Sequence, residues 1–154
     1  MSFLSVEKIS AGYGGHPILA DVSFQLEQGC MMGILGANGC GKTTLLKTIC
    51  GILPHKGTCL LEQTVLEQLS ARRMARLVGY IPQRSGISID ISVLDVVMMG
   101  FNPRLGLLER PGRKMQDLAA QALEQVGLGG RMDAFVDGLS RGMQQRLCLA
   151  RALI

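Results

Sequence analysis

Tryptophan is absent from the 154-residue sequence, and aromatic residues make up only 4% of it. Proteins that bind nucleic acid more often combine a basic stripe with aromatic side chains. Here the net charge is +4 and the basic residues are scattered, so no nucleic-acid partner is expected. No run of about 18 apolar residues occurs, so we expect no membrane-spanning segment. The first ten residues also lack the apolar region of a secretory signal.

The five cysteines contain no C-x-x-C pair, and their odd number provides no disulfide framework. This pattern predicts free thiols in a reducing compartment and no zinc site. The two histidines, His16 and His55, have no neighbouring ligand residues in the sequence, and we interpret both as structural.

The hydrophobic share of 47% and the length are sufficient for a buried core. Alternating apolar and polar residues at 6–14 and 22–26 predict two antiparallel strands joined by a turn. The continuous apolar run at residues 30–36 predicts a strand buried on both faces of a sheet. Further strands are expected at 58–61 and 78–82, and helices at 42–53, 70–77 (with Ser70 as N-cap), 92–100, 114–126 and 140–153.

Residues 36–43, GANGCGKT, match the pattern G-x-x-x-x-G-K-[ST] between the predicted buried strand and a helix. Glycines let successive backbone N–H groups point into one concavity, and the helix N-terminus adds partial positive charge. Lys42 could reach the terminal phosphates, and the Thr43 hydroxyl could ligate Mg²⁺. The pattern predicts a nucleoside triphosphate site; the alternative is a glycine-rich turn with a solvated lysine. The residues expected to bind the nucleotide here are Gly36, Asn38, Gly39, Cys40, Gly41, Lys42, Thr43 and Thr44.

Three further motifs resemble those in the nucleotide-binding subunits of ABC transporters. This resemblance extends from Ser5 to the last residue. AGYGG at 11–15 resembles the A-loop, which implies that Tyr13 stacks on adenine. YIPQ at 80–83 resembles the Q-loop, which implies that Gln83 contacts Mg²⁺ or the attacking water and senses the membrane partner. LSRGMQQR at 139–146 resembles the signature LSGGQ. The alternatives are a strand-end aromatic, an exposed loop glutamine and a plain N-capped helix.

In this family two subunits enclose two ATP molecules, and the signature of one faces the γ-phosphate held by the other. The resemblance therefore implies that Ser140 and Gly142 bind phosphate. The sequence departs from the family at Arg141, where glycine is usual, and at Met143, where glutamine is usual. A positive φ would strain Arg141, whereas an arginine beside phosphate could add charge-assisted hydrogen bonds. Similar departures occur in some export-type ABC subunits.

Asp95 could be compared with the Mg²⁺-holding aspartate of a kinase. It is followed by valine and lies inside a helical pattern, so we interpret it as a helix-surface residue.

The resemblance implies an α/β fold: a P-loop NTPase core sheet with an antiparallel β part at the N-terminus and an α-helical subdomain, incomplete at the C-terminus. The expected divisions are 1–84 for the ATP-binding core, 85–139 for the helical subdomain and 140–154 for the signature helix returning to the core. In the family a strand ending in Asp-Glu follows, and this sequence contains no Asp-Glu pair. We therefore expect an N-terminal portion of an ABC-type ATPase that binds ATP and Mg²⁺ but does not itself hydrolyse ATP. Lys42 and Gln83 are the residues expected at the reacting phosphate.

Residues 92–112 further resemble the subgroup that imports iron-siderophore complexes, haem and cobalamin. This implies an energy-coupling homodimer on the cytoplasmic face of the inner membrane, bound peripherally to transmembrane permease subunits and served by an external substrate-binding protein. An export-type or non-transport ABC ATPase, a P-loop small-molecule kinase and a fragment that only binds nucleotide remain as alternatives.

Overall fold

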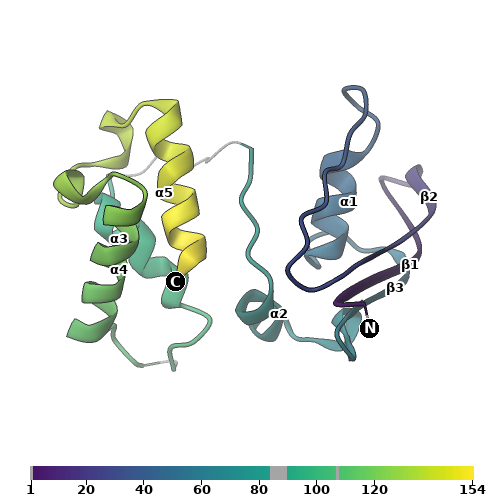
Figure 1. Cartoon of the computed structure of the whole chain (residues 1–154), viewed down its shortest axis with the longest axis horizontal. Coiled ribbons are helices and arrows are strands. Elements are labelled where there is room, and N and C mark those ends of the chain that lie inside the picture. The colour runs from purple at the N-terminus through teal and green to yellow at the C-terminus, as the bar shows by residue number, and fades with distance from the viewer. Residues whose placement is uncertain (1, 84–89, 107) are drawn as a thin grey trace. The chain divides into compact units, whose positions relative to one another are not determined.

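The computed structural model describes residues 2–83, 90–106 and 108–154 (Figure 1). The chain divides into two compact units, Met1–Val78 and Gly79–Ile154. In the described parts of the chain, no helix combines the length and the hydropathy that a membrane span needs.

The first unit contains an antiparallel sheet with the strand order β2-β1-β3-β4. Gly14 and Gly15 both have positive φ, 55° and 82°, which permits the two-residue turn between the first two strands. The prediction of two antiparallel N-terminal strands is confirmed, as is the strand expected at 58–61. The strands are β1 (Leu4–Tyr13), β2 (His16–Leu26), β3 (Lys56–Leu61) and β4 (Thr64–Val65).

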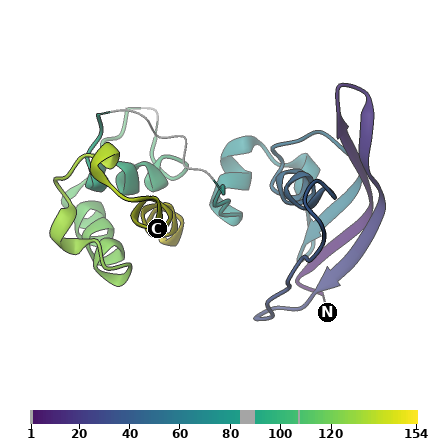
Figure 2. The ribbon, with the colours of Figure 1, turned by 90° about the horizontal axis from the view of Figure 1, so that it is seen from above.

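Helix α1 (Lys42–Ile49) packs against one face of this sheet (Figure 2). Its apolar residues Leu45 and Ile49 join a core with Val6 and Ile9 of β1 and Leu19 of β2. Leu45 and Ile49 are four residues apart, which places them on the same face of the helix.

After β4 the chain forms the short helix η1 (Leu66–Gln68) and then α2 (Ala71–Leu77). Ser70 is the N-cap of α2, and its Oγ accepts a hydrogen bond from the Arg73 amide at 3.4 Å. The helix and its cap are as the sequence predicts.

Two predicted strands are not formed. Residues 30–36 belong to no strand, and Met31 and Leu35 are 98% and 93% exposed. Residues 78–82 also lie outside the sheet. The apolar run was interpreted as a strand buried on both faces, and that interpretation is wrong for this structure. A strand forms its hydrogen bonds with neighbouring strands. Among the described residues, neither segment is paired with a strand of the sheet.

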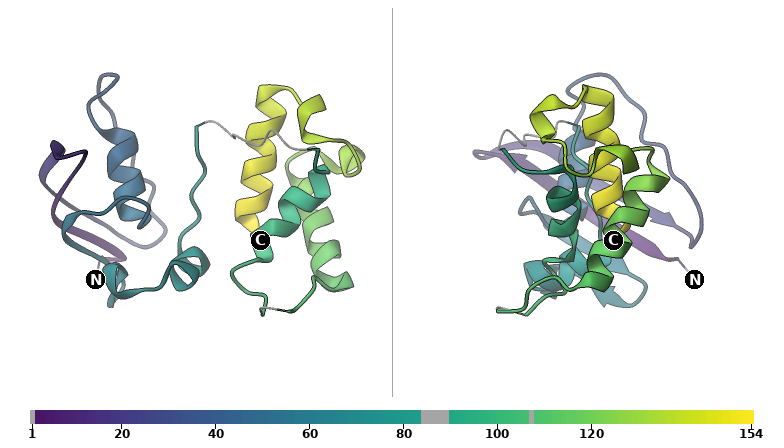
Figure 3. Two further views of the ribbon diagram at one scale, coloured as in Figure 1. Left: turned by 180° about the vertical axis from the view of Figure 1, so that it is seen from behind. Right: turned by 90° about the vertical axis from the view of Figure 1, so that its left-hand side faces the viewer.

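The second unit is helical, and α5 lies alongside α3 and α4 in it (Figure 3). Its core joins Val93 and Val97 of α3, Leu123 of α4, and Leu147 and Ala150 of α5, all of them buried. The elements are α3 (Val93–Met98), η2 (Met99–Phe101), α4 (Arg113–Gln125), η3 (Gly129–Arg131), η4 (Val136–Gly138) and α5 (Arg141–Leu153).

Asp95 lies in the first turn of α3, where it completes a cap with Ser92. The Asp95 amide donates to Ser92 Oγ at 3.0 Å, and Ser92 Oγ donates to Asp95 Oδ2 at 2.6 Å. This exchange satisfies one free amide of the helix start. The interpretation of Asp95 as a helix residue is confirmed.

Candidate nucleotide-binding site

The glycine-rich loop enters α1 through a backbone conformation that requires glycine. Gly39 has φ 82°, and Gly41, the residue before the helix, has φ 97°. A Cβ atom added to Gly41 would lie only 2.9 Å from Leu19 Cδ2, because the loop runs close beside β2. The left-handed φ would strain a larger residue at position 41, and the Leu19 side chain would have to shift to make room for it.

Lys42, the first residue of α1, folds back over the loop. Its Nζ donates to the carbonyl oxygens of Gly36 and Ala37, at 2.7 Å each, and lies 3.7 Å from Cys40 Sγ. The ammonium is therefore held at the loop. Oxygen atoms of an anion bound in this loop could replace the two carbonyl acceptors.

Helix α1 begins without a side-chain cap, unlike helices α2, α3 and α5. Helices α2, α3 and α5 each begin at a serine whose Oγ accepts an amide hydrogen bond, whereas the N-cap of α1, Gly41, has no side chain to do so. The first turn of α1 also contains no acidic residue. Its amides thus keep their capacity to bind an anion, and the helix dipole favours one there.

The two threonines that follow Lys42 are placed differently. Thr43 is exposed, so its hydroxyl can approach a metal ion at the loop. Thr44 is buried, and its carbonyl accepts a hydrogen bond from Thr48 Oγ at 2.8 Å. Thr43 is therefore the more accessible of the two residues.

Tyr13 ends β1 at the hairpin tip, paired with His16. It is 45% exposed, so part of the side chain is accessible from solvent. Tyr13, the loop residues 36–43 and Thr44 all belong to the first unit.

The remaining predicted site residues belong to the second unit. Gln83 is exposed and lies outside helices and strands. Ser140 is the N-cap of α5, and its Oγ accepts from the Met143 amide at 3.4 Å. Arg141 is not among the described residues with positive φ, so the strain considered for it is not present. A Cβ at Gly142 would meet nothing within 4 Å, so this glycine leaves open space at the helix start.

Sequence reasoning missed one group of side chains of the kinds that ligate metals. His55 has no neighbouring ligand residues in the sequence, but in the fold it lies in one cluster with Cys59 and Glu67. The spacing of these residues matches no motif that we considered, because Glu67 reaches Cys59 only across the β3–β4 hairpin.

A glycine-rich loop that leads into an uncapped helix, with a lysine folded over it and an exposed threonine next, is the phosphate-binding loop of the P-loop NTPase class. The family model described as ABC transporter matches residues 19–154, and the chain belongs to this family.

Named relatives agree with the family and differ in what they transport. The chain is 39% identical over 153 residues to the zinc transport system ATP-binding protein TroB of Treponema pallidum (strain Nichols), covering 98% of this chain and 56% of TroB. It is 38% identical over 153 residues to the manganese transport system ATP-binding protein MntB of Bacillus subtilis (strain 168), covering 97% and 59%. It is 40% identical over 151 residues to the hemin import ATP-binding protein HmuV of Bordetella pertussis (strain Tohama I), covering 97% and 56%. The chain thus spans little more than half the length of these relatives.

Solved structures support the same fold. An ATP-binding cassette of an ABC transporter, MJ1267, superposes with a TM-score of 0.84 at 25% identity, covering 99% of this chain and 65% of that one. A chain from a proposed metal-chelate type ABC transporter in an inward-facing conformation gives 0.80 at 29% identity, covering 99% and 55%. The predicted α/β fold class, with its antiparallel β part and helical part, is confirmed.

Proposed function

We propose that residues 36–43 bind the phosphates of ATP and that Thr43 holds the accompanying Mg²⁺. The position of Lys42 carries this proposal: its Nζ lies over the loop, 2.7 Å from two loop carbonyls, at the start of a helix with free amides. Phosphate oxygens would take the place of these carbonyls, and the ammonium would neutralise part of their charge. Tyr13 would stack on the adenine. As the family resemblance implies, Gln83 would contact the metal or the attacking water, and Ser140 and Gly142 would bind the γ-phosphate held by a second subunit.

We further propose that the chain acts as the energy-coupling, ATP-binding subunit of an ABC importer for a transition metal or a metal chelate. The relatives named for zinc, manganese and hemin transport support this substrate class, as does the metal-chelate type transporter among the solved structures. The partners would be transmembrane permease subunits, a second nucleotide-binding subunit and an external substrate-binding protein.

The first test compares two lysines of the same helix. Lys42→Ala removes the charge aimed at the terminal phosphates, whereas Lys47→Ala removes one from the last turn of α1, away from the loop. Titration with a fluorescent ATP analogue should show binding weakened at least about tenfold in Lys42→Ala, because one charge-assisted hydrogen bond contributes about 1.5–3 kcal/mol. Lys47→Ala should bind as the wild type does.

Adenosine serves as the second ligand in this titration. It lacks phosphates, so Lys42→Ala should leave its binding unchanged. Equal ATP affinity in the wild type and Lys42→Ala would falsify the assignment of the phosphate site.

A further inference from the structure

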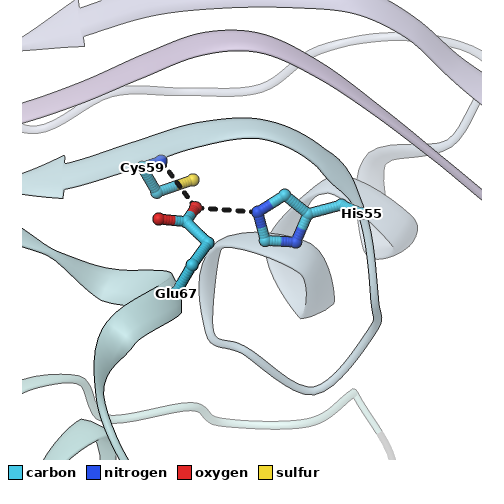
Figure 4. A group of neighbouring side chains, drawn as sticks. All are labelled: His55, Cys59 and Glu67. Atoms are coloured by element: carbon cyan, nitrogen blue, oxygen red, sulfur yellow. Dashed lines mark hydrogen bonds and ion pairs between the residues drawn. The ribbon is translucent and has the colours of Figure 1, made fainter.

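Three side chains of the kinds that ligate transition metals meet at the β3–β4 hairpin, outside residues 36–43 (Figure 4). His55 precedes β3, Cys59 lies in β3 and Glu67 lies in η1. One ligand atom from each lies within 4.8 Å of the others. Zinc takes its ligands at about 2.0–2.3 Å, so donor atoms around a tetrahedral ion lie roughly 3.3–3.8 Å apart. Small side-chain rotations would bring the three donors to that spacing.

The imidazole of His55 has the orientation that a metal ligand needs. Its Nδ1 lies 3.3 Å from the carbonyl oxygen of Leu53, and its Nε2 faces Glu67 Oε1 at 2.8 Å. Without a metal, Nε2–H can donate to Glu67. To bind an ion, Nε2 must give up this proton; in the tautomer with the proton on Nδ1, that nitrogen donates to Leu53 and the lone pair of Nε2 points into the cluster. Histidines that bind metals typically donate their other ring N–H to a backbone carbonyl or a carboxylate, which fixes both tautomer and ring.

The carboxylate of Glu67 is positioned from the opposite side. The backbone amide of Cys59 donates to Glu67 Oε1 at 2.7 Å, which holds the carboxylate beside the Cys59 side chain. Burial alone would raise the pKa of Glu67, but the hydrogen bonds from His55 and from the Cys59 amide outweigh burial and lower it. The group therefore carries a negative charge at neutral pH, as a cation site requires.

Cys59 supplies the ligand that distinguishes between metals. It is 1% exposed, and burial together with the Glu67 charge raises its pKa to about 12. Without a metal the thiol keeps its proton; on binding, the S–H bond breaks, the proton passes to solvent and a sulfur–metal bond forms. A set of one thiolate, one imidazole and one carboxylate suits zinc-class ions, whereas Mg²⁺ and Mn²⁺ prefer oxygen ligands.

We propose that His55, Cys59 and Glu67 form a binding site for a single zinc-class ion, Zn²⁺ or Co²⁺, with water completing its coordination. The side chain of Glu67 is 28% exposed, which gives the ion a route from solvent. The ion would join three segments, namely the loop after α1, strand β3 and helix η1. This site is independent of the nucleotide and of the proposed transport function.

The experiment uses Co²⁺ as a spectroscopic probe of the reduced chain, residues 1–154. A thiolate bound to Co²⁺ gives a charge-transfer band in the near ultraviolet, and tetrahedral Co²⁺ gives intense bands in the visible. The titration should saturate at one Co²⁺ per chain, and stoichiometric Zn²⁺ should abolish the bands. Excess Mg²⁺ or Mn²⁺ should leave them unchanged.

Variants assign the three ligands. Cys59→Ser should remove the charge-transfer band. His55→Gln and Glu67→Gln should each weaken Co²⁺ binding at least tenfold, since even changes behind the ligands cost about 10–100-fold. Gln at position 67 still offers an acceptor to the Cys59 amide, so this variant should keep the fold. The controls His16→Gln and Cys30→Ser, both at exposed positions, should bind as the wild type does.

Three outcomes would overturn the site: no charge-transfer band in the wild type, a band that persists in Cys59→Ser, or equal affinities in Glu67→Gln, His55→Gln and the controls. The last outcome would leave His55 and Glu67 as a simple ion pair. If Cys59→Ser does not fold, the other two variants decide the question, and circular dichroism checks the fold of each.

Discussion

Tyr13 lies at the tip of the β1–β2 hairpin, and its partly exposed side chain is not part of the buried core. Tyr13→Ala should therefore leave the unfolding free energy nearly unchanged but remove base stacking of about 1–3 kcal/mol. Because stacking involves the base alone, ATP and ADP should weaken by the same factor, whereas Lys42→Ala should affect ATP more.

Tyr13→Phe provides the matched control, since it keeps the ring and loses only the hydroxyl. Calorimetric titration of both nucleotides against all three proteins distinguishes the two roles considered for this residue. Unchanged nucleotide affinity in Tyr13→Ala would leave it as a strand-end aromatic.

Cys40 is the thiol that a bound nucleotide should protect. It is exposed, it lies in the glycine-rich loop, and its Sγ is 3.7 Å from Lys42 Nζ. Alkylation should label Cys40 rapidly and slow down when Mg-ATP is present. Burial raises the pKa of both Cys50 and Cys59, so these thiols supply little of the reactive thiolate and should label slowly.

Peptide mapping with mass spectrometry measures each thiol separately. Cys30 is also exposed but lies outside residues 36–43, so its labelling should not depend on Mg-ATP. Equal protection of both exposed cysteines, or faster labelling of Cys50 than of Cys40, would contradict nucleotide binding at this loop.

The start of α5 combines a structural role with a proposed role in phosphate binding, and substitutions at Ser140 can separate them. Its Oγ accepts the Met143 amide, and replacing an N-cap serine by alanine costs about 1 kcal/mol. Ser140→Ala should therefore lower the unfolding free energy by about that amount. Ser140→Asp should preserve stability, because aspartate is an equally good cap, yet it should oppose phosphate binding through its charge.

Urea unfolding measures the first effect, and ATP binding by a dimer of these subunits measures the second. If Ser140→Asp binds ATP as the wild type does, the start of α5 is an ordinary capped helix with no role in phosphate binding.

Helices could be predicted from this sequence better than strands, for a physical reason. A helix forms its hydrogen bonds within one segment, and its serine caps are neighbours in sequence, so Ser70 and Ser140 could be recognised directly. The strand expected at 30–36 needs partners that sequence neighbours do not supply. Its apolar composition predicts burial, but composition alone does not provide the strand that would cover Met31 and Leu35.

The same reasoning explains which sites could be recognised in advance. The residues of the glycine-rich loop are contiguous, and a spacing rule describes them. His55, Cys59 and Glu67 come from three elements, and only the fold of the β3–β4 hairpin brings them together. No spacing rule applies to such a set. A histidine, a cysteine and a glutamate within thirteen residues of a hairpin region could nevertheless have suggested a metal site.

At the scale of the whole molecule, the residues proposed to hold the nucleotide include no carboxylate that could activate water. Hydrolysis requires a base within hydrogen-bond reach of the attacking water, and Mg²⁺ is usually held by a carboxylate in addition to the loop threonine. The first unit contains five carboxylates, and none lies in residues 36–43 or in α1: Glu7, Asp21, Glu27, Glu62 and Glu67. Gln83 can orient a water molecule, but its amide is not a base.

We therefore expect this chain to bind Mg-ATP without multiple turnovers. Phosphate release from the purified chain should stay at the level seen with Lys42→Ala, which controls for contaminating ATPases. Adding separately purified permease subunits should not change this result, because they cannot supply the carboxylate that the loop lacks. Multiple turnovers that disappear in Lys42→Ala would instead show that one of the carboxylates present reaches the γ-phosphate. Substituting the twelve carboxylates of the chain one at a time by the matching amides would then identify the base.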